Sequence, residues 1–215
     1  MNNFLKINNT IYFWIICILY FVFAFFSKQF LYTDQLYYST LGEQFTSEQI
    51  QKVLVSQNMT WKQIVGYAAI PLVIIIRVLY TSFCLLIGNL INETHWKYNS
   101  LYNLSLKAEI AFCLNSICNF YYYVISQNYN TVEDLSVNCG SLLKLVGKES
   151  IPNWLIFAYN SINLFELIYV ILLILFIQIC FRISCWKSIV FVLLTYCIGN
   201  YLYVVGLTFL YLNFS

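Results

Sequence analysis

The sequence predicts an all-α membrane protein, a polytopic helix bundle with five transmembrane helices and a short amphipathic helix in its first long loop. Of its 215 residues, 61% are hydrophobic and only 9% are charged, against roughly 45–50% and about 25% in soluble domains. So little charge cannot cover a surface that faces water. The apolar residues also gather in five runs, each long enough to cross ~30 Å of hydrocarbon as a helix.

These runs predict a single integral membrane domain over residues 1–215, with spans at about 11–31, 64–91, 106–126, 156–180 and 186–212. Within each run the residues are continuously apolar. The strands of a membrane β-barrel would instead alternate between apolar and polar residues. The pattern therefore favours helices.

Charge and motifs exclude several classes of protein. Lys and Arg number 11 and Asp and Glu number 9, a net charge of +2 without any basic run, so nucleic-acid binding is not expected. His95 is the only histidine. The sequence contains no H-E-x-x-H, G-x-S-x-G or C-x-x-C motif. We therefore expect no catalytic residues, no metal site and no cofactor, and predict that the protein is not an enzyme.

The first two spans each carry one informative feature. Lys6 followed by an apolar run resembles a signal peptide, but no small-residue cleavage site follows, so we expect an uncleaved first span. The second span contains Pro71, which lacks a backbone N–H and predicts a kink there.

The loop of residues 32–63 contains the pattern of a short amphipathic helix. Thr46 or Ser47 can cap its start. Three apolar residues then share one side at helical spacing: Ile50, Val53 and Leu54. We expect this helix to lie on the membrane surface, with Trp61 as an interfacial anchor before the second span.

A second long loop covers about 127–153. Its segment Thr131–Leu135 reads as a capped helical turn, and Pro152 and Trp154 introduce the fourth span. The other connections are short.

Basic residues predict the orientation. With the N-terminus inside, the inner segments carry five basic residues: Lys6, Lys97, Lys107, Arg182 and Lys187. The outer loops also carry five: Lys28, Lys52, Lys62, Lys144 and Lys148. The inner segments are much shorter, so their density of positive charge is higher. We therefore predict a multi-pass protein with a cytoplasmic N-terminus.

Apart from lysines close to the span ends, three charged residues fall inside the predicted spans: Arg77, Glu109 and Glu166. Such a charge costs about 2.5–3.5 kcal/mol at the bilayer centre and needs a partner. Counting 1.5 Å per residue along each span places Arg77 about 20 Å deep and Glu166 about 15 Å deep from the same side. We expect these two to pair, and Glu109 to sit near the interface in the first turn of its span.

Amides extend this intramembrane polar cluster. Asn115 and Asn119 lie one turn apart on the third span, Asn163 shares a face with Glu166, and Asn200 lies near the middle of the fifth span. Two interpretations remain open. These groups can hydrogen-bond across helices and hold the bundle together, or they can line a polar pathway for an ion or small solute.

The order of several short segments resembles a known group of proteins. These segments are Trp61–Ile64, Ile70–Leu72 with Arg77, Lys107–Phe112, Thr131–Leu135, and Asn163–Glu166 with Tyr169. The chain is similar over residues 46–212 to five-span inner-membrane proteins of Bacteroidetes, themselves loosely similar to the Yip1 family. The segment Asn138–Leu143 departs from the pattern, because a Pro-Leu-Ser-Leu type segment is expected there. The resemblance implies a topology and supports one polar constellation, but it implies almost no biochemistry.

The function we expect is that of a non-enzymatic scaffold or accessory subunit of a membrane or envelope complex. Its partners would be the lipid bilayer and another membrane or envelope protein. The alternative is a transporter or channel component with a polar route near Arg77 and Glu166. A protein that protects its host, such as an immunity protein, and an enzyme are the remaining alternatives.

Overall fold

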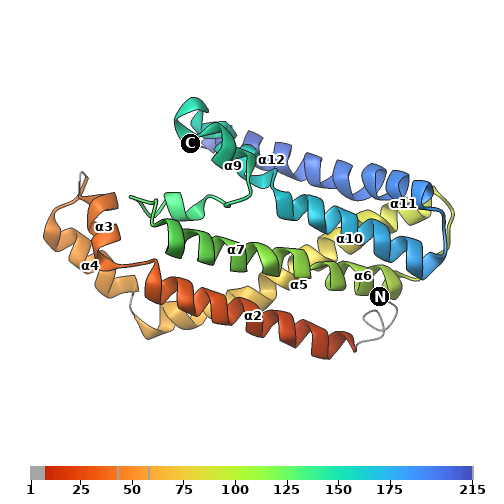
Figure 1. The fold of residues 1–215 in the computed structure, drawn as a ribbon, viewed down its shortest axis with the longest axis horizontal. Coiled ribbons are helices and arrows are strands. Elements are labelled where there is room, and N and C mark those ends of the chain that lie inside the picture. The colour runs from red at the N-terminus through yellow and green to blue at the C-terminus, as the bar shows by residue number, and fades with distance from the viewer. Residues whose placement is uncertain (1–7, 43, 58, 215) are drawn as a thin grey trace.

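The computed structural model describes residues 8–42, 44–57 and 59–214, and every regular secondary-structure element over these residues is a helix. Its only β-type pairing in the described residues is an isolated bridge between Ser141 and Asn163. The all-α prediction is therefore confirmed. The long helices run side by side along the length of the molecule (Figure 1).

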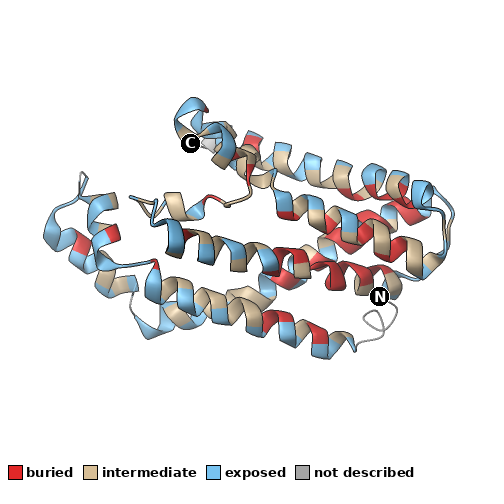
Figure 2. Ribbon diagram, viewed as in Figure 1, coloured by how far each residue is buried: buried red, intermediate tan, exposed pale blue. Residues whose placement is uncertain are grey.

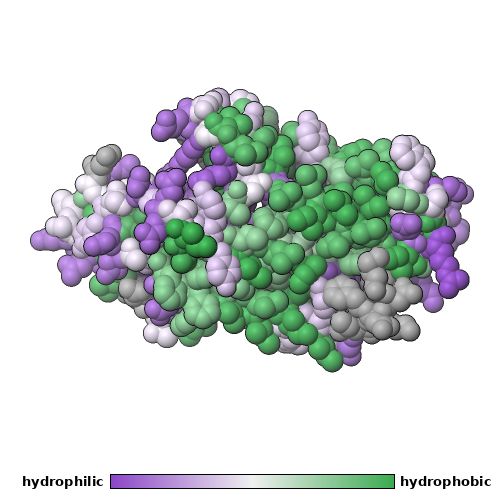
Figure 3. Space-filling model, in the orientation of Figure 1, coloured by the Kyte–Doolittle hydropathy of each residue, from purple (hydrophilic) through white to green (hydrophobic). Residues whose placement is uncertain are grey.

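Four helical stretches of the described chain are long and apolar enough to cross a membrane. They are α2 (Asn9–Phe30), α5 (Thr60–Ile91), α10 (Leu164–Phe181) and the stretch Cys185–Asn213. The first, second and fourth of these stretches match the spans predicted at 11–31, 64–91 and 186–212, and Pro71 lies inside α5. Apolar side chains cover the middle of the molecule and hydrophilic ones collect at its two ends (Figure 3). These features identify a multi-pass membrane protein.

The third predicted span is interrupted where the sequence showed an unbroken run. Helix α6 (Tyr98–Ala108) ends at Glu109, and α7 (Ile110–Ser126) begins directly after it. The helical segment thus starts eight residues before the predicted boundary of 106 and turns at Glu109. At this turn the Glu109 N–H donates to the Leu106 carbonyl at 3.3 Å. This bond joins residues three apart, as in a 3₁₀-helix, whereas the bonds of an α-helix join residues four apart.

The prediction of a continuous fourth span over 156–180 is wrong. Helix α9 (Ile156–Ser161) stops, Ile162 and Asn163 are extended, and α10 starts at Leu164. The extended pair bonds to the preceding loop, where the Leu142 N–H donates to Ile162 O at 2.9 Å. Asn163 Oδ1 also accepts from the Glu166 N–H at 2.8 Å. An Asn that caps a helix competes with its own inclusion in that helix, which explains the break.

The last membrane helix contains a local change of winding. Helix α11 (Cys185–Val192) passes through a π-helical segment, η4 (Leu193–Cys197), into α12 (Ile198–Phe214). Such π segments inside α-helices are rare and often occur at functional sites.

Both long loops fold into short helices at the end of the bundle that also holds the C-terminus (Figure 1). The first loop forms α3 (Asp34–Leu41), which the sequence analysis missed, and α4 (Ser47–Gln57). The amphipathic helix is confirmed, because α4 buries Ile50 on one side. The segment between α7 and α10, which extends beyond the predicted loop of 127–153, contains five short helices: η1 (Asp134–Ser136), α8 (Leu142–Val146), η2 (Lys148–Ser150), η3 (Asn153–Leu155) and α9.

Buried side chains concentrate in the half of the bundle away from these loops (Figure 2). One core cluster joins α5, α6, α7, α10 and the last membrane helix around Tyr169 and Leu173. A second joins α2, α5, α6 and α7 around Ile16 and Val78. The α6–α7 segment contributes to both clusters and therefore forms the centre of the bundle.

The predicted turn at Thr131–Leu135 is confirmed, and Asp134 organises it. Asp134 Oδ2 accepts hydrogen bonds from the N–H groups of Asn130 and Thr131, both at 3.0 Å. Burial alone would raise the pKa of Asp134, but these N–H donors and the nearby Lys148 outweigh it and lower the pKa below its ordinary value. The turn is therefore stabilised above the ordinary Asp pKa, and this contribution is lost as the pH falls through the lowered value.

The Asp134→Ala variant is expected to open the turn at Thr131–Leu135 at neutral pH. Hydrogen exchange at the Asn130 and Thr131 amides should rise by about tenfold, since a hydrogen bond to a charged group contributes about 1.5–3 kcal/mol when it is shielded from solvent. Glu149→Ala, an exposed acidic residue of the same loop, serves as the control and should leave exchange unchanged. Equal exchange in both variants would show that Asp134 does not hold the turn.

Candidate functional site

The centre of the bundle contains a buried ion pair between Arg77 of α5 and Glu109 at the α6–α7 turn. Arg77 Nε lies 3.0 and 2.9 Å from the two carboxylate oxygens of Glu109, and Nη2 lies 2.5 Å from Oε2. Glu109 is fully buried, whereas the Arg77 side chain is 30% exposed. Two-point contact of this kind is the strongest geometry that an Arg and a carboxylate can adopt.

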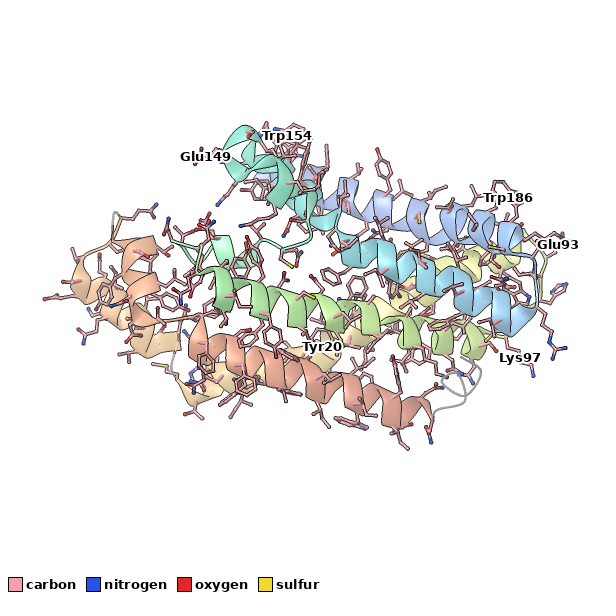
Figure 4. All side chains as sticks on the ribbon, in the orientation of Figure 1. Tyr20, Glu93, Lys97, Glu149, Trp154 and Trp186 are labelled. Carbon is pink, nitrogen blue, oxygen red and sulfur yellow. The ribbon has the colours of Figure 1, made fainter. Side chains whose placement is uncertain are left out.

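Two aromatic residues complete the surroundings of Arg77. Its Nη2 donates to the Tyr20 hydroxyl of α2 at 2.9 Å. The ring of Phe112 stacks on the guanidinium, with 4.1 Å between the ring centre and the Arg77 Cζ atom. Tyr20 lies near the middle of the bundle (Figure 4). Arg77 thus joins α2, α5 and α6–α7 in one interaction.

The predicted Arg77–Glu166 ion pair and the interfacial position of Glu109 are both wrong. The depth count assumed that the third span began at residue 106. Because α6 adds 11 residues before Glu109 and α7 adds 17 after it, Glu109 lies near the middle of that segment. Glu166 lies in the first turn of α10 and bonds to other groups.

Asn115 and Asn119 share a face of α7, as predicted, and they fasten the second loop to the bundle. Both donate their side-chain amides to Asn138 Oδ1, at 3.0 and 2.9 Å respectively. Asn119 Oδ1 accepts from the backbone N–H of Cys139 at 2.7 Å. These amides therefore act on the loop rather than joining the Arg77 pair.

Glu166 and Asn200 lie together in a polar cluster that is separate from the Arg77–Glu109 pair. Glu166 Oε1 accepts from the Tyr196 hydroxyl at 2.6 Å and from the Asn200 side-chain amide at 3.2 Å. Tyr196 belongs to the π-helical segment η4. Asn163 contributes by capping α10, and its side chain bonds to the Glu166 backbone N–H. Among the described residues, none donates a hydrogen bond to Glu166 Oε2.

This cluster lies in a cleft of about 580 Å³ between α10 and α12. The two helices are held apart: α10 packs against α11, and α12 packs against α9 and η3 at the other end. The walls are mostly apolar, and they include Val170, Val204 and Phe209. Trp154 lines the cleft beside the second loop, near the C-terminal end of the bundle (Figure 4). An apolar cleft with a few convergent polar groups has the character of a binding site.

Sequence reasoning missed Tyr20, Asn138 and Tyr196, which complete the three polar clusters. Tyrosines are so abundant in this chain, with 19 in all, that none stands out. Asn138 lies in the loop after α7, 23 and 19 residues from its partners Asn115 and Asn119, so no spacing signal connects them. Across the described ranges no group of three or more His, Cys, Asp or Glu side chains is arranged to hold a metal ion.

Comparisons with protein-family models, with curated proteins and with solved structures give no match to this chain. The assignment of a site therefore depends on geometry. In the Arg77–Glu109 pair the two charged groups bind each other, and Tyr20 and Phe112 fill the remaining contacts of Arg77. The cleft at Glu166 is open, contains an unpaired acceptor and adjoins two irregular helix segments, so we take it as the candidate functional site.

Arg77→Leu is expected to destabilise the protein strongly, because it leaves the Glu109 carboxylate buried without a counter-charge, a cost of about 3–5 kcal/mol. Arg77→Leu with Glu109→Leu should recover most of that stability. The measurement is the midpoint of thermal unfolding in mild detergent.

The matched control is Arg77→Leu with Glu166→Leu, which removes the carboxylate that the sequence favoured as a partner. This double variant should be no more stable than Arg77→Leu alone. Recovery by the Glu166 change instead of the Glu109 change would contradict the observed pairing.

Proposed function

We propose that this chain is a non-enzymatic five-span protein of the cell inner membrane that acts as a scaffold or accessory subunit of a membrane or envelope complex. The observation that carries the proposal is the layer formed by the two long loops, which we call the platform: residues 31–42, 44–57 and 127–163. At the opposite end of the bundle the connections are only short turns around Glu93, Lys97 and Trp186 (Figure 4).

The platform is ordered by hydrogen bonds between segments far apart in the sequence. The Ser39 hydroxyl donates to the Asn130 carbonyl at 2.7 Å, and the Val132 N–H donates to the Thr40 hydroxyl at 2.9 Å. The Asn138 anchor on α7 then fixes this layer to the membrane bundle. Loops that served only as connections would not require such cross-links.

The platform also exposes apolar side chains. Leu145 of α8 is 84% exposed, and Phe45 and Val55 of the first loop are exposed as well. Exposed apolar side chains on an ordered layer are available for contact with a partner. They favour a partner protein that covers the platform.

The polar interior favours a scaffold over a transport route. A route near Arg77 and Glu166 requires the two residues to line one path. They belong instead to separate clusters, and Arg77 is occupied by Glu109 and Tyr20. Interhelical bonds of this kind hold a bundle together.

The fifth span of the proposal is α6–α7. It contacts α2 and α10 through both of its helices and α5 through α6, so it would cross the membrane with them. Five crossings put the platform on the outer side when the N-terminus is cytoplasmic. The resemblance to Yip1-like five-span proteins supports the same topology.

Reporter fusions test this topology. A phosphatase active only outside the cytoplasm should be active when fused after Asn128 or Gly147, and inactive after Glu93 or Arg182. Green fluorescent protein, which requires the cytoplasm, should give the reverse pattern. Fusions after Glu93 and Asn128 that report the same side would exclude α6–α7 as a span.

Site-specific photocrosslinking tests the partner. A photoreactive amino acid at Leu145 should give a discrete adduct with one envelope protein in native membranes. The control position is Trp186, which is 73% exposed at the opposite end and should not give that adduct. When the photoreactive amino acid is placed instead at Val146, which is 45% exposed on the same helix, Leu145→Asp should abolish the adduct. The absence of any protein adduct from position 145 would contradict the scaffold proposal.

A further inference from the structure

We infer that the cleft between α10 and α12 binds one long-chain amphiphile from the membrane, whose polar end is a hydrogen-bond donor, a hydroxyl or an amine. This site adjoins the platform, whose residues Trp154 and Asn163 help to line it, but the inference does not depend on the scaffold function. Its polar end is Glu166 with Asn200, and its apolar walls extend from there to Trp154 and Leu212.

The size and borders of the cleft fit one lipid chain. Its lining on η4 and α12 runs from Tyr196 to Leu212, about 24 Å at 1.5 Å per residue. Its volume of about 580 Å³ lies within the ~300–1,000 Å³ of small-molecule sites. Helix α9 packs on α12 at one end, and α10 packs on α11 at the other. One lipid chain covers about half of the ~30 Å hydrocarbon core, so it fits within this length.

The polar end of the cleft determines which amphiphile would bind. A hydrocarbon chain gains little by leaving lipid for an apolar cleft, because both surroundings are equally apolar. Discrimination must therefore come from hydrogen bonds at Glu166 and Asn200. Glu166 Oε1 is already held by Tyr196 and Asn200, which fixes the orientation of the carboxylate.

The groups left open at this end are acceptors. Within the described part of the chain, neither Glu166 Oε2 nor Asn200 Oδ1 receives a hydrogen bond. Two adjacent acceptors require a ligand that donates, such as an alcohol or an amine. They disfavour a fatty acid, whose carboxylate would face Glu166.

The irregular backbone around the cleft supports a binding role. The extended pair Ile162–Asn163 begins α10 beside the cleft, and the π-helical segment η4 turns Tyr196 toward Glu166. Both interruptions forgo regular helix bonds inside a membrane protein. They meet at the same carboxylate, and irregular segments of this kind often occur at functional sites.

The test measures retention of radiolabelled probes by the purified full chain after gel filtration in mixed detergent micelles. The probes are hexadecanol, hexadecylamine, hexadecanoic acid and hexadecane. We expect about one hexadecanol or hexadecylamine per chain, with hexadecanoic acid and hexadecane at the background of empty micelles. Equal retention of all four probes, or retention of none, would overturn the proposal.

Two variants locate the binding. Glu166→Gln keeps an acceptor for Tyr196 and Asn200 but replaces Oε2 by a donor, so retention of the alcohol should fall about tenfold or more. Val204→Trp fills the apolar part of the cleft and should abolish retention. Leu202→Trp is the control, because Leu202 is exposed on α12 outside the cleft lining, and it should bind as the unchanged protein does. Normal retention in Val204→Trp would overturn the site even if Glu166→Gln fails to fold.

A photoreactive residue at Val204 distinguishes the occupant in native membranes. Adducts of lipid mass support the inference. A protein adduct at this position would show that a partner helix occupies the cleft and would overturn it. Because the platform is probed separately at Leu145, failure here leaves the scaffold proposal standing, and the reverse is also true.

Discussion

The structure depends first on the pairing of Arg77 with Glu109 in the middle of a bundle that lies in hydrocarbon. An unpaired charge at that depth is costly, so the two residues constrain where α5 and α6–α7 can lie. The Tyr20 hydroxyl extends the constraint to α2, and Phe112 covers the guanidinium. Apolar packing around this point is abundant but unspecific, because lipid tails compete for the same surfaces. The ion pair therefore determines the register of the three helices.

Arg77 neutralises Glu109, so the second intramembrane carboxylate, Glu166, has a different role. Glu166 is held by a hydroxyl and an amide instead of by a cation, and it borders a cleft. The helix break before α10 and the π segment before α12 both occur there. The protein thus separates a structural polar cluster, a loop anchor at Asn138 and an open polar end at Glu166, each with its own partners.

Much of the fold could be predicted from the sequence, because continuous apolar runs, the Ile50 periodicity and the turn at Asp134 are local signals. The Asn115–Asn119 face also follows from helical spacing. The pairing of Arg77 could not be predicted, because it depends on depth and so on the residue where each helix begins. The polar start of α6 at Tyr98 and the cap at Asn163 moved those boundaries. The resemblance to Yip1-like proteins and the cytoplasmic N-terminus stay predictions.

The most direct measurement of the central claim is the ionisation of Glu109 in the membrane. Infrared difference spectroscopy of the unchanged protein against Glu109→Gln, both in lipid nanodiscs at neutral pH, isolates this one carboxyl group. A salt-bridged Glu109 predicts that the band lost in Glu109→Gln is that of an ionised carboxylate. It also predicts that the band shifts when Arg77 is replaced by Lys, which cannot make the same two-point contact. Loss of a protonated carboxyl band instead would contradict the ion pair as the organising interaction of the fold.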